Sequence, residues 1–490
     1  MRLKLALLWA AALVAWAVDD ARAAQPSAKR PNFIFILLDD QGWGDASAFG
    51  HPYMRTPNID RIVREGTWFT QFYVANPVCS PSRTAFMTGQ YPARLRIHEH
   101  LATHEMNQAR GMPDWLDPDV VTVAKLLKQA GYATAHFGKW HLGNGPDAPP
   151  PQAYGIDDAK CVNANSNAWD ESKQPYFRAR STGLFVDETI RFIKEHREQP
   201  FYVNLWTLVP HAKLQPTDEE LARYAELLAK PDDFPSWMRD YVAQAKSPTE
   251  QMRVFCAAMS GLDSAIGRLL EFLDAEGLAD STAIVMSSDN GPEDYHIGNA
   301  ANAGIGWPGV FRGRKRSLYE GGLRVPLVVR WPGHVPAGRR DDDALLASVD
   351  FLPTVCKLAG VSENTGTPDG EDASDILLGS SRQRTKPICW QWCGNVAGDA
   401  AYRPPRLAIR DGKWKLFVEM DGSSPQLYDI PADPEERHDL ASQQPDVVQR
   451  FSTLAVAWSK TLPAAPLLDE PAGKKRSAKA PQAADRSSAN

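Results

Sequence analysis

Short apolar runs that end abruptly in polar residues recur along this chain and alternate with stretches of helical periodicity. The runs are NFIFILLDD, YATAHFGKWHLG, FYVNLWTLVPH and STAIVMSSDNG, which start at residues 32, 132, 201 and 281. Such runs are typical of buried parallel strands. Before the last run, apolar residues recur at helical spacing from Met252 to Leu273, and Gly277 follows. This alternation predicts an α/β fold with a mainly parallel central sheet sandwiched between helices.

A change of pattern after about residue 380 predicts a second, smaller unit. PRLAIRDGKWKLFVEMDGSSPQLYDI, from residue 405, has two Asp-Gly turns between strand-like runs, and DVVQRFSTLAVAW, from residue 446, has the periodicity of a closing helix. We therefore expect a main domain over residues 31–380 and a C-terminal α+β subdomain, built on an antiparallel sheet, over residues 381–465. The basic tail 466–490 is rich in Ala, Ser and Lys, which is typical of disorder.

Residues 1–23 have the features of a signal peptide. Arg2 and Lys4 precede the apolar stretch LALLWAAALVAWAV, and small residues follow near Ala23. A membrane anchor is the alternative, but the run is short for a span, and no other run in the sequence is long and apolar enough. We expect export to the periplasm or the extracellular space.

Charge and cysteine content exclude some classes of protein. The net charge of −6 makes nucleic acid an unexpected partner. Six cysteines in 490 residues are too few for a disulfide scaffold, although CWQWC would allow a local bond between Cys389 and Cys393.

One cysteine lies in a setting that suits chemistry. In NPVCSPSRTAFMTGQYPARL, Pro81 fits the first turn of a helix and Gly89 fits its end. Cys79 would then lie at the helix N-terminus, where backbone N–H groups favour an anion, and Arg83 would share its face. A nucleophile beside a cation suits attack on a sulfate or phosphate. The alternative is a small buried cysteine.

Paired acidic and amide residues follow two of the predicted strands, at the sheet edge where open parallel sheets bind ligands. Asp39 and Asp40 end the first run, and Asp289 and Asn290 end the last. These hard oxygen ligands suit Ca²⁺ or Mg²⁺, and three unpaired carboxylates would repel one another without a cation. Helix capping is the alternative for either pair alone. Two pairs on matching strand ends favour a metal site.

Basic residues and histidines follow other strands. Lys139 and His141 are two residues apart, so on an extended chain they would point the same way, one to hold an anion and one to move a proton. His211 follows the run that starts at residue 201. Lys315 lies in the basic loop GRKRSLYEGG. The alternatives are a polar strand edge for the pair and a solvated surface for Lys315.

The residues singled out above resemble the sequence motifs of a known family. CSPSRTAFMTGQYP, from Cys79, resembles the signature of the type I, formylglycine-dependent sulfatases, in the alkaline-phosphatase-like superfamily: Cys-x-Pro-x-Arg followed by Thr-Gly. LLDDQGWGD, GKWHLG, SSDNGPE and KRSLYEGGLRVP resemble the family's other blocks in the family's order, and LYDIPADPEERHDLA is similar to its C-terminal subdomain. The likeness runs from about residue 31 to 460 and points to bacterial arylsulfatase and N-acetylgalactosamine-6-sulfatase-like enzymes.

The resemblance implies a sulfuric ester hydrolase whose Cys79 is converted to formylglycine by a maturing enzyme. One hydroxyl of the hydrated aldehyde attacks sulfur, and the second allows sulfate to leave. The implied ligands of one Ca²⁺ ion are Asp39, Asp40, Asp289 and Asn290. The other implied roles are polarisation by Arg83, sulfate binding by Lys139 and Lys315, proton removal from the diol by His141, and protonation of the leaving alcohol by His211.

The expected substrate is a sulfated carbohydrate or an aryl sulfate. Loops at residues 97–111, 292–307 and 312–316 carry polar and aromatic groups suited to sugars. Three alternatives stay open: a phosphodiesterase or phosphonate monoester hydrolase of the same superfamily, a non-catalytic protein that binds sulfated glycans, and a thiol hydrolase that uses Cys79 with a histidine. The last explains neither the acidic pairs nor Lys139 and Lys315.

Overall fold

The computed structural model describes residues 30–143, 145–163, 169, 176–294, 300–361, 366–394 and 400–464. The predicted signal peptide and basic tail lie outside these residues. The chain forms an eight-stranded sheet in the order β4-β3-β5-β1-β6-β7-β2-β8. Its strands are β1 (Asn32–Asp39), β2 (Thr67–Tyr73), β3 (Ala133–Lys139), β4 (Asp158–Val162), β5 (Phe201–Pro210), β6 (Thr282–Ser288), β7 (Arg324–Arg330) and β8 (Arg339–Ala347).

The sheet is mainly parallel, as predicted. β1 lies at its centre and pairs in parallel with both β5 and β6, with Ile34 opposite Val203 on one side and Ile284 on the other. Only β7, among the described strands of this sheet, runs antiparallel to its neighbours, β6 and β2. Every residue of β1 is buried, because helices cover both faces of the sheet.

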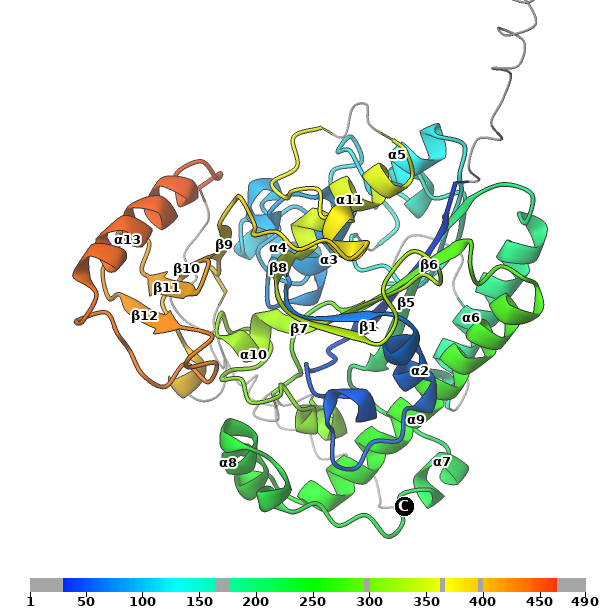
Figure 1. Cartoon of the computed structure of the whole chain (residues 1–490), viewed down its shortest axis with the longest axis horizontal. Coiled ribbons are helices and arrows are strands. Elements are labelled where there is room, and N and C mark those ends of the chain that lie inside the picture. Colours follow the sequence, from blue (N-terminus) through cyan, green and yellow to red (C-terminus); the bar gives the residue numbers. More distant parts are fainter. Residues whose placement is uncertain are drawn as a thin grey trace, which may run out of the picture.

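Helices form a layer on each side of the sheet (Figure 1). The apolar side chains of β1 alternate between two cores: Phe33 and Phe35 face one layer, and Ile34 and Ile36 face the other. The first layer contains α3 (Cys79–Thr88), α5 (Val123–Gln129) and α11 (Phe351–Leu358), and the second contains α2 (Pro57–Glu65), α6 (Phe177–Glu195) and α9 (Pro248–Ala275). Shorter helices are α4 (His104–Ala109), α7 (Asp218–Ala222), α8 (Ser236–Gln244), α10 (Glu320–Leu323) and α12 (Ser374–Leu377).

A separate antiparallel sheet forms the C-terminal part of the chain, on the left of Figure 1. Its order is β12-β11-β10-β9, and α13 (Pro445–Ser459) packs against it. The strands are β9 (Ile388–Gln391), β10 (Leu407–Asp411), β11 (Trp414–Val418) and β12 (Gln426–Asp429). The predicted meander and closing helix are confirmed. Gly412 makes the first turn at φ 54°, in the left-handed region that glycine tolerates. β9 is a fourth strand that the sequence analysis did not predict.

A buried ionic cluster joins the two sheets. Lys415 of β11 donates to Glu320 of α10 at 2.8 Å and lies 3.1 Å from Glu436. Tyr73 of β2 donates to Glu320 at 2.6 Å, and Arg410 of β10 donates to Tyr73. Burial would raise the pKa of Glu320, but Lys415 and Arg410 lower it to about 2, so this carboxylate is charged and paired. Buried polar contacts of Glu320 and Tyr73 with Lys415 and Arg410 therefore tie the C-terminal sheet to β2 and α10.

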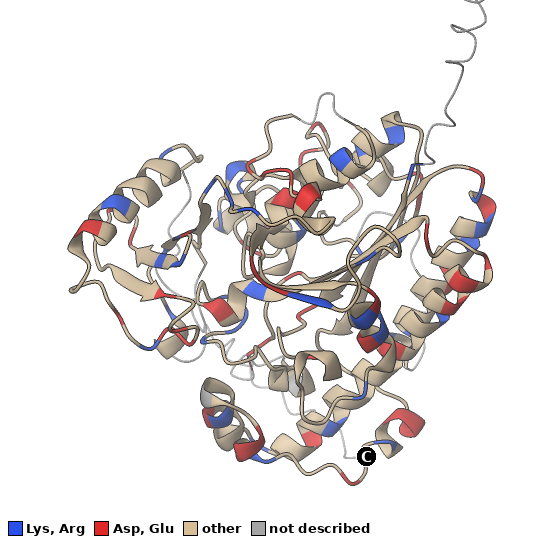
Figure 2. Ribbon diagram, viewed as in Figure 1, with Lys and Arg blue, Asp and Glu red and all other residues tan. Residues whose placement is uncertain are grey.

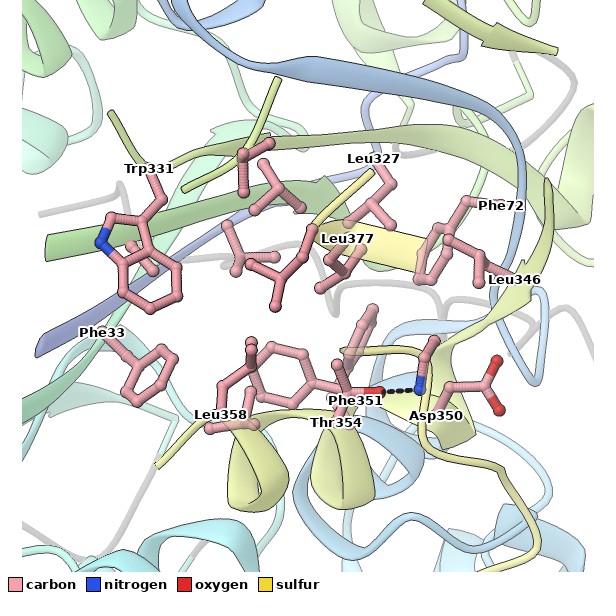
Figure 3. A pocket seen from close by; sticks show the side chains of 18 of the residues that line it. Phe33, Phe72, Leu327, Trp331, Leu346, Asp350, Phe351, Thr354, Leu358 and Leu377 are labelled. Atoms are coloured by element: carbon pink, nitrogen blue, oxygen red, sulfur yellow. Dashed lines mark hydrogen bonds between the residues drawn. The ribbon is translucent and has the colours of Figure 1, made fainter. Parts of the chain in front are cut away.

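A small apolar cavity of about 40 Å³ lies between the central sheet and α11 and α12 (Figure 3). Phe33 and Leu358 are among the side chains that line it. The polar groups at its edge have partners: Thr354 Oγ1 accepts from the N–H of Ala373 at 2.9 Å, and Asp350 pairs with Arg384. This cavity is a packing gap in the core, without groups that would bind a polar substrate.

The structure also answers two smaller expectations. Cys389 and Cys393 are both buried free cysteines, so the local disulfide that CWQWC would allow is not formed. Within the described ranges, we find no helix with the length and apolar character needed to cross a bilayer. Figure 2 shows acidic and basic residues interspersed along the outer helices, such as α6.

Candidate active site

Four neighbouring strands deliver polar side chains to one edge of the central sheet. In spatial order, β3 ends with Lys139, β5 is followed by His211, β1 ends with Asp39, and β6 is followed by Asp289. Because these strands are parallel and adjacent, their carboxyl ends converge, which is where open α/β sheets bind ligands. The structure thus brings together residues that lie up to 250 positions apart in the chain.

The acidic residues are buried and paired with lysines. Lys139 Nζ donates to both carboxylate oxygens of Asp39, at 2.8 and 2.7 Å. Lys315 Nζ donates to both oxygens of Asp40, at 2.6 and 2.8 Å. The sequence analysis treated the carboxylates as unpaired. That was wrong, because basic residues from distant segments meet them here.

Helix α3 carries Cys79 and Arg83 into the same site, as predicted. Cys79 is the first residue of the helix, and Gly89 ends it at φ 67°. Arg83, fully buried, donates to Asp289 at 2.7 Å and lies 3.4 Å from Asp39. Its guanidinium also stacks 5.0 Å from the ring of Trp206. These contacts fix a positive charge beside the nucleophile candidate.

Burial and the charges at this site shift the pKa values of two carboxyl groups in opposite directions. Burial would raise the pKa of Asp39, but Lys139, His211 and Arg83 hold it well below its ordinary value. Burial raises the pKa of Asp289 well above its ordinary value, and the neighbouring carboxylates add to this despite Arg83. A divalent cation would favour the ionised form of Asp289, so metal binding would release a proton.

The predicted metal ligands form a compact set of oxygen donors. Carboxylate oxygens of Asp39, Asp40 and Asp289 lie within 4.8 Å of one another. Asn290 Nδ2 donates to Asp40 at 2.7 Å and to the carbonyl of Gly291 at 2.8 Å. Its Oδ1 is buried and lacks a partner in the described part of the chain. A buried acceptor without a donor is unfavourable, and a cation would satisfy it. The residues therefore fit a hard cation such as Ca²⁺.

Lys139 and His141 do not share an extended strand. β3 ends at Lys139, and His141 adopts a left-handed conformation at φ 58°. The prediction that they point the same way along one strand is therefore wrong. His141 Nε2 lies 3.1 Å from the carbonyl of Leu101, whereas Nδ1 is buried without a partner among the described residues. Burial, reinforced by Lys139 and Arg83, holds the pKa of His141 well below its ordinary value, so the ring is neutral.

His211 lies beside the acidic group. Its Nε2 is 3.8 Å from Asp40 Oδ2, and its Nδ1 is 2.7 Å from the carbonyl of Ala212. Burial lowers the pKa of His211 to about 4, against the pull of Asp39 and Asp40. Arg178, which the sequence analysis did not select, donates to the carbonyl of His211 at 2.7 Å and so holds this backbone in place.

The loop that carries Lys315 is part of the site and not a solvated surface. Lys315 is 3% exposed, and its N–H donates to the carbonyl of Pro292 at 2.9 Å. Glu293 lies 3.5 Å from Lys315 and pairs with Arg316. Burial would raise the pKa of Glu293, but Lys315 and Arg316 lower it to about 2. The sequence analysis assigned Glu293 no role, although its place four residues after Asp289 was a usable signal.

A cavity of about 750 Å³, with both apolar and polar side chains in its lining, adjoins His141. Leu101, Thr103, Trp115 and Asn163 are among the residues that line it. It therefore offers an aromatic side chain and hydrogen-bonding groups next to the buried ionic site.

Comparison with known proteins identifies the class of this site. Residues 31–361 match the family model described as sulfatase, and residues 308–455 match the model described as N-sulphoglucosamine sulphohydrolase, C-terminal. The chain belongs to the sulfatase family. It is accordingly a sulfuric ester hydrolase.

Curated sulfatases are similar to this chain over most of its length. Human arylsulfatase A is 29% identical over 470 residues, covering 87% of each chain. N-acetylgalactosamine-6-O-sulfatase of Bacteroides thetaiotaomicron is 27% identical over 520 residues, covering 87% of this sulfatase and 93% of the relative. Human N-acetylgalactosamine-6-sulfatase is 31% identical over 377 residues, covering 71% of this sulfatase and 64% of the relative.

Solved structures agree with this fold. The structure described as Ps i-CgsB in complex with k-i-k-neocarrahexaose has a TM-score of 0.70 and 26% identity, and covers 88% of this sulfatase and 93% of that chain. Phosphonate monoester hydrolase of Agrobacterium radiobacter has a TM-score of 0.63 at 20% identity, and covers 88% of this sulfatase and 96% of that chain. That likeness shows the fold alone.

Proposed function

We propose that this sulfatase is exported and hydrolyses sulfate esters of a carbohydrate, with formylglycine at position 79 and one Ca²⁺ ion. The observation that carries the proposal is the convergence of Cys79, Arg83 and two lysines on a buried set of oxygen ligands at the sheet edge. Asp39, Asp40, Asp289 and Asn290 would hold the ion. When bound, Ca²⁺ would supply positive charge that polarises a sulfate oxygen.

The nucleophile is a modified cysteine in this proposal. As formylglycine, residue 79 supplies a hydrated aldehyde, with one hydroxyl for attack on sulfur and a second that allows sulfate to leave. Arg83, buried and bonded to Asp289, supplies a fixed positive charge beside it. His141 is neutral and its Nδ1 has no partner among the described residues, so it can accept a proton.

Sulfate recognition falls to the two lysines. An ammonium group has three N–H donors, and the bonds to Asp39 and Asp40 leave donor capacity on both Lys139 and Lys315 for sulfate oxygens. His211 is the proposed acid for the leaving alcohol. Its ring is neutral in this arrangement, but an anionic ester beside it would raise its pKa and favour the protonated form.

The proposed substrate class rests on the cavity and on the relatives. Trp115 and polar groups line the cavity beside His141, and such a lining suits a sugar ring. Two of the relatives are named for sulfated N-acetylgalactosamine. Relatives named steryl-sulfatase match this chain over a similar length, so the lining of the cavity is what favours a carbohydrate sulfate.

Mass spectrometry of the peptide that contains Cys79 tests this proposal. We expect turnover per molecule to rise in proportion to the aldehyde fraction across preparations made with and without a maturing enzyme. Cys79→Ala should fold, because replacing this small side chain at the helix end leaves little cavity. It should lack turnover, because the nucleophile is removed. Full activity of unmodified protein would overturn the mechanism. Hydrolysis of phosphonate monoesters in preference to sulfate esters would overturn the substrate class.

A further inference from the structure

A carboxylate–imidazole pair lies beside His141 and has no role in the mechanism above. His100 Nδ1 is 2.9 Å from Glu99 Oε1, and the same oxygen accepts the backbone N–H of His100 at 3.0 Å. The side chain of Glu99 is 9% exposed, whereas that of His100 is 34% exposed. The carboxylate is thus inside the protein and the imidazole reaches the surface.

The segment that carries this pair is fixed to the catalytic residues on both sides. The N–H of Leu101 donates to the hydroxyl of Ser80, the residue after Cys79, at 3.0 Å. The carbonyl of Leu101 lies 3.1 Å from His141 Nε2. The rings of His100 and His141 are 6.4 Å apart, centre to centre. His100 is therefore held close to His141, the residue proposed to accept a proton during catalysis.

Glu99 also fixes which nitrogen of His100 carries the proton. Burial would raise the pKa of Glu99, but the hydrogen bond and charge of His100, together with Arg316, lower it to about 2. An ionised carboxylate accepts hydrogen bonds only, so Nδ1 of His100 carries the hydrogen. Nε2 is then the ring nitrogen that remains for a hydrogen bond to another group. Among the described residues, Nε2 has no hydrogen-bond partner, and Arg110 holds the carbonyl of His100 at 2.9 Å.

We propose that His100 is a specificity-determining residue whose Nε2 forms a hydrogen bond with a hydroxyl of the sugar that bears the scissile sulfate. This inference rests on the proposed function. Its partner would be a hydroxyl of the substrate close to the sulfated carbon. A sugar ring carries such hydroxyls on neighbouring carbons, whereas a simple aryl sulfate offers none. His100 thereby favours sulfated carbohydrates over aryl sulfates.

The simplest competing explanation is that Glu99 and His100 only hold the loop together. His100→Asn separates the two, because the Asn amide can still donate to Glu99 from the position of Nδ1 but has no atom at the position of Nε2. His196→Asn is the matched control. His196 Nδ1 also bonds to a neighbour, Gln199, at 3.0 Å, but His196 precedes β5 and so lies at the opposite edge of the sheet.

The experiment compares kcat/KM of matured wild-type protein, His100→Asn and His196→Asn. The substrates are 4-nitrophenyl sulfate, a panel of monosulfated hexoses and N-acetylhexosamines, and deoxy analogues of the best sugar. For His100→Asn we expect a loss of ~10-fold or more on the sugar sulfate and a clearly smaller loss on the aryl sulfate. The wild-type protein should discriminate against one deoxy analogue, and His100→Asn should not.

Equal losses on both substrate types, or wild-type behaviour of His100→Asn on the sugar, would overturn the inference. If the wild-type protein hydrolyses the aryl sulfate and none of the sugars, the inference also fails while the sulfatase mechanism stands. If protein with verified formylglycine hydrolyses neither, the proposed function itself fails.

Discussion

Asn290 donates a 2.7 Å hydrogen bond from Nδ2 to Oδ1 of Asp40, and the other end of its amide, Oδ1, is buried without a donor from any residue that the structure describes. The two residues follow different strands, β6 and β1, which lie side by side at the centre of the sheet. The orphaned oxygen is thus a product of the strand order. It also marks the position at which a cation would be most stabilising.

Asp289→Ala should abolish Ca²⁺ binding. For the wild-type protein, Ca²⁺ at 100 times its Kd should raise the free energy of unfolding by ~2.7 kcal/mol. Thermal unfolding with and without Ca²⁺ measures this shift, whether or not the protein is catalytically active. Asp263→Ala is the control, because Asp263 is a buried carboxylate that accepts from the backbone of Asn58 and Ile59, away from the site. That variant should be less stable but keep the shift. A full Ca²⁺-induced shift in Asp289→Ala would refute the ligand assignment.

Lys315→Ala should weaken catalysis on every sulfate ester, whatever the alcohol. Loss of one group that stabilises charge in the transition state costs ~100- to 1,000-fold in rate. The variant should also be less stable, because Asp40 loses the cation 2.6 Å away. Lys413→Ala is the control, since Lys413 is exposed and bonds Asp429 in the C-terminal sheet. Kinetics on an aryl sulfate and two sugar sulfates decide the case. A loss confined to one sugar would instead place Lys315 in a sugar subsite.

Trp115→Ala should raise KM for sulfated oligosaccharides more than for an aryl sulfate. Trp115 lines the cavity beside His141, where a sugar ring would stack on it. We expect KM for sulfated oligosaccharides to increase ~10-fold, which corresponds to a loss of ~1.4 kcal/mol of binding free energy. Trp414→Ala, in the C-terminal sheet, should behave as the wild-type protein. If Trp115→Ala leaves oligosaccharide KM unchanged, the cavity is not the sugar site.

His51 should make the protein less stable as the pH falls below 6.5. Burial lowers its pKa from 6.5 to about 3, so between these values the unfolded chain binds a proton that the folded protein does not. The free energy of unfolding should therefore decrease by up to ~1.4 kcal/mol per pH unit over this range from His51 alone. His51→Asn keeps an acceptor for the N–H groups of Tyr53 and Met54, which Nδ1 accepts at 3.2 Å.

Urea unfolding at several pH values between 4 and 7.5 compares this variant with the wild-type protein. The slope should be shallower for His51→Asn and unchanged for His438→Asn, because the side chain of His438 is 78% exposed. Parallel curves for wild type and His51→Asn would show that His51 does not contribute to acid destabilisation.

Local pattern was enough to predict the strands that carry the site and the edge at which their polar ends meet. Asp39 and Asp289 each follow an apolar run, and parallel strands bring such ends to one side. The Lys139–Asp39 and Lys315–Asp40 pairs were not predictable in the same way. They depend on the order of the strands and the path of a long loop, which local periodicity does not encode. For the same reason the reversed direction of β7 and the fourth C-terminal strand, β9, went unpredicted.

The sequence analysis selected the loop at residues 97–111 for sugar contacts, but it did not single out the Glu99–His100 pair within that loop. A Glu-His dipeptide in a polar loop is common, and only the burial of one partner and the exposure of the other make it unusual. Burial of loop residues depends on the contacts of Leu101 with Ser80 and His141, which come from other segments.

The ionic cluster around Glu320 limits how the gene for this protein can recombine with related genes. Glu320 lies five residues after Lys315, and its partners Lys415 and Arg410 belong to the C-terminal sheet. Recombination between related genes at a point near residue 380 would combine a Glu320 from one parent with basic partners from another. Hybrids without the basic partners would leave buried Glu320 with Arg324, 3.3 Å away, but without Lys415 and Arg410, close to the loop that carries Lys315. The two sheets should therefore be exchanged between genomes as one block, with new substrate preferences arising by change within the loops.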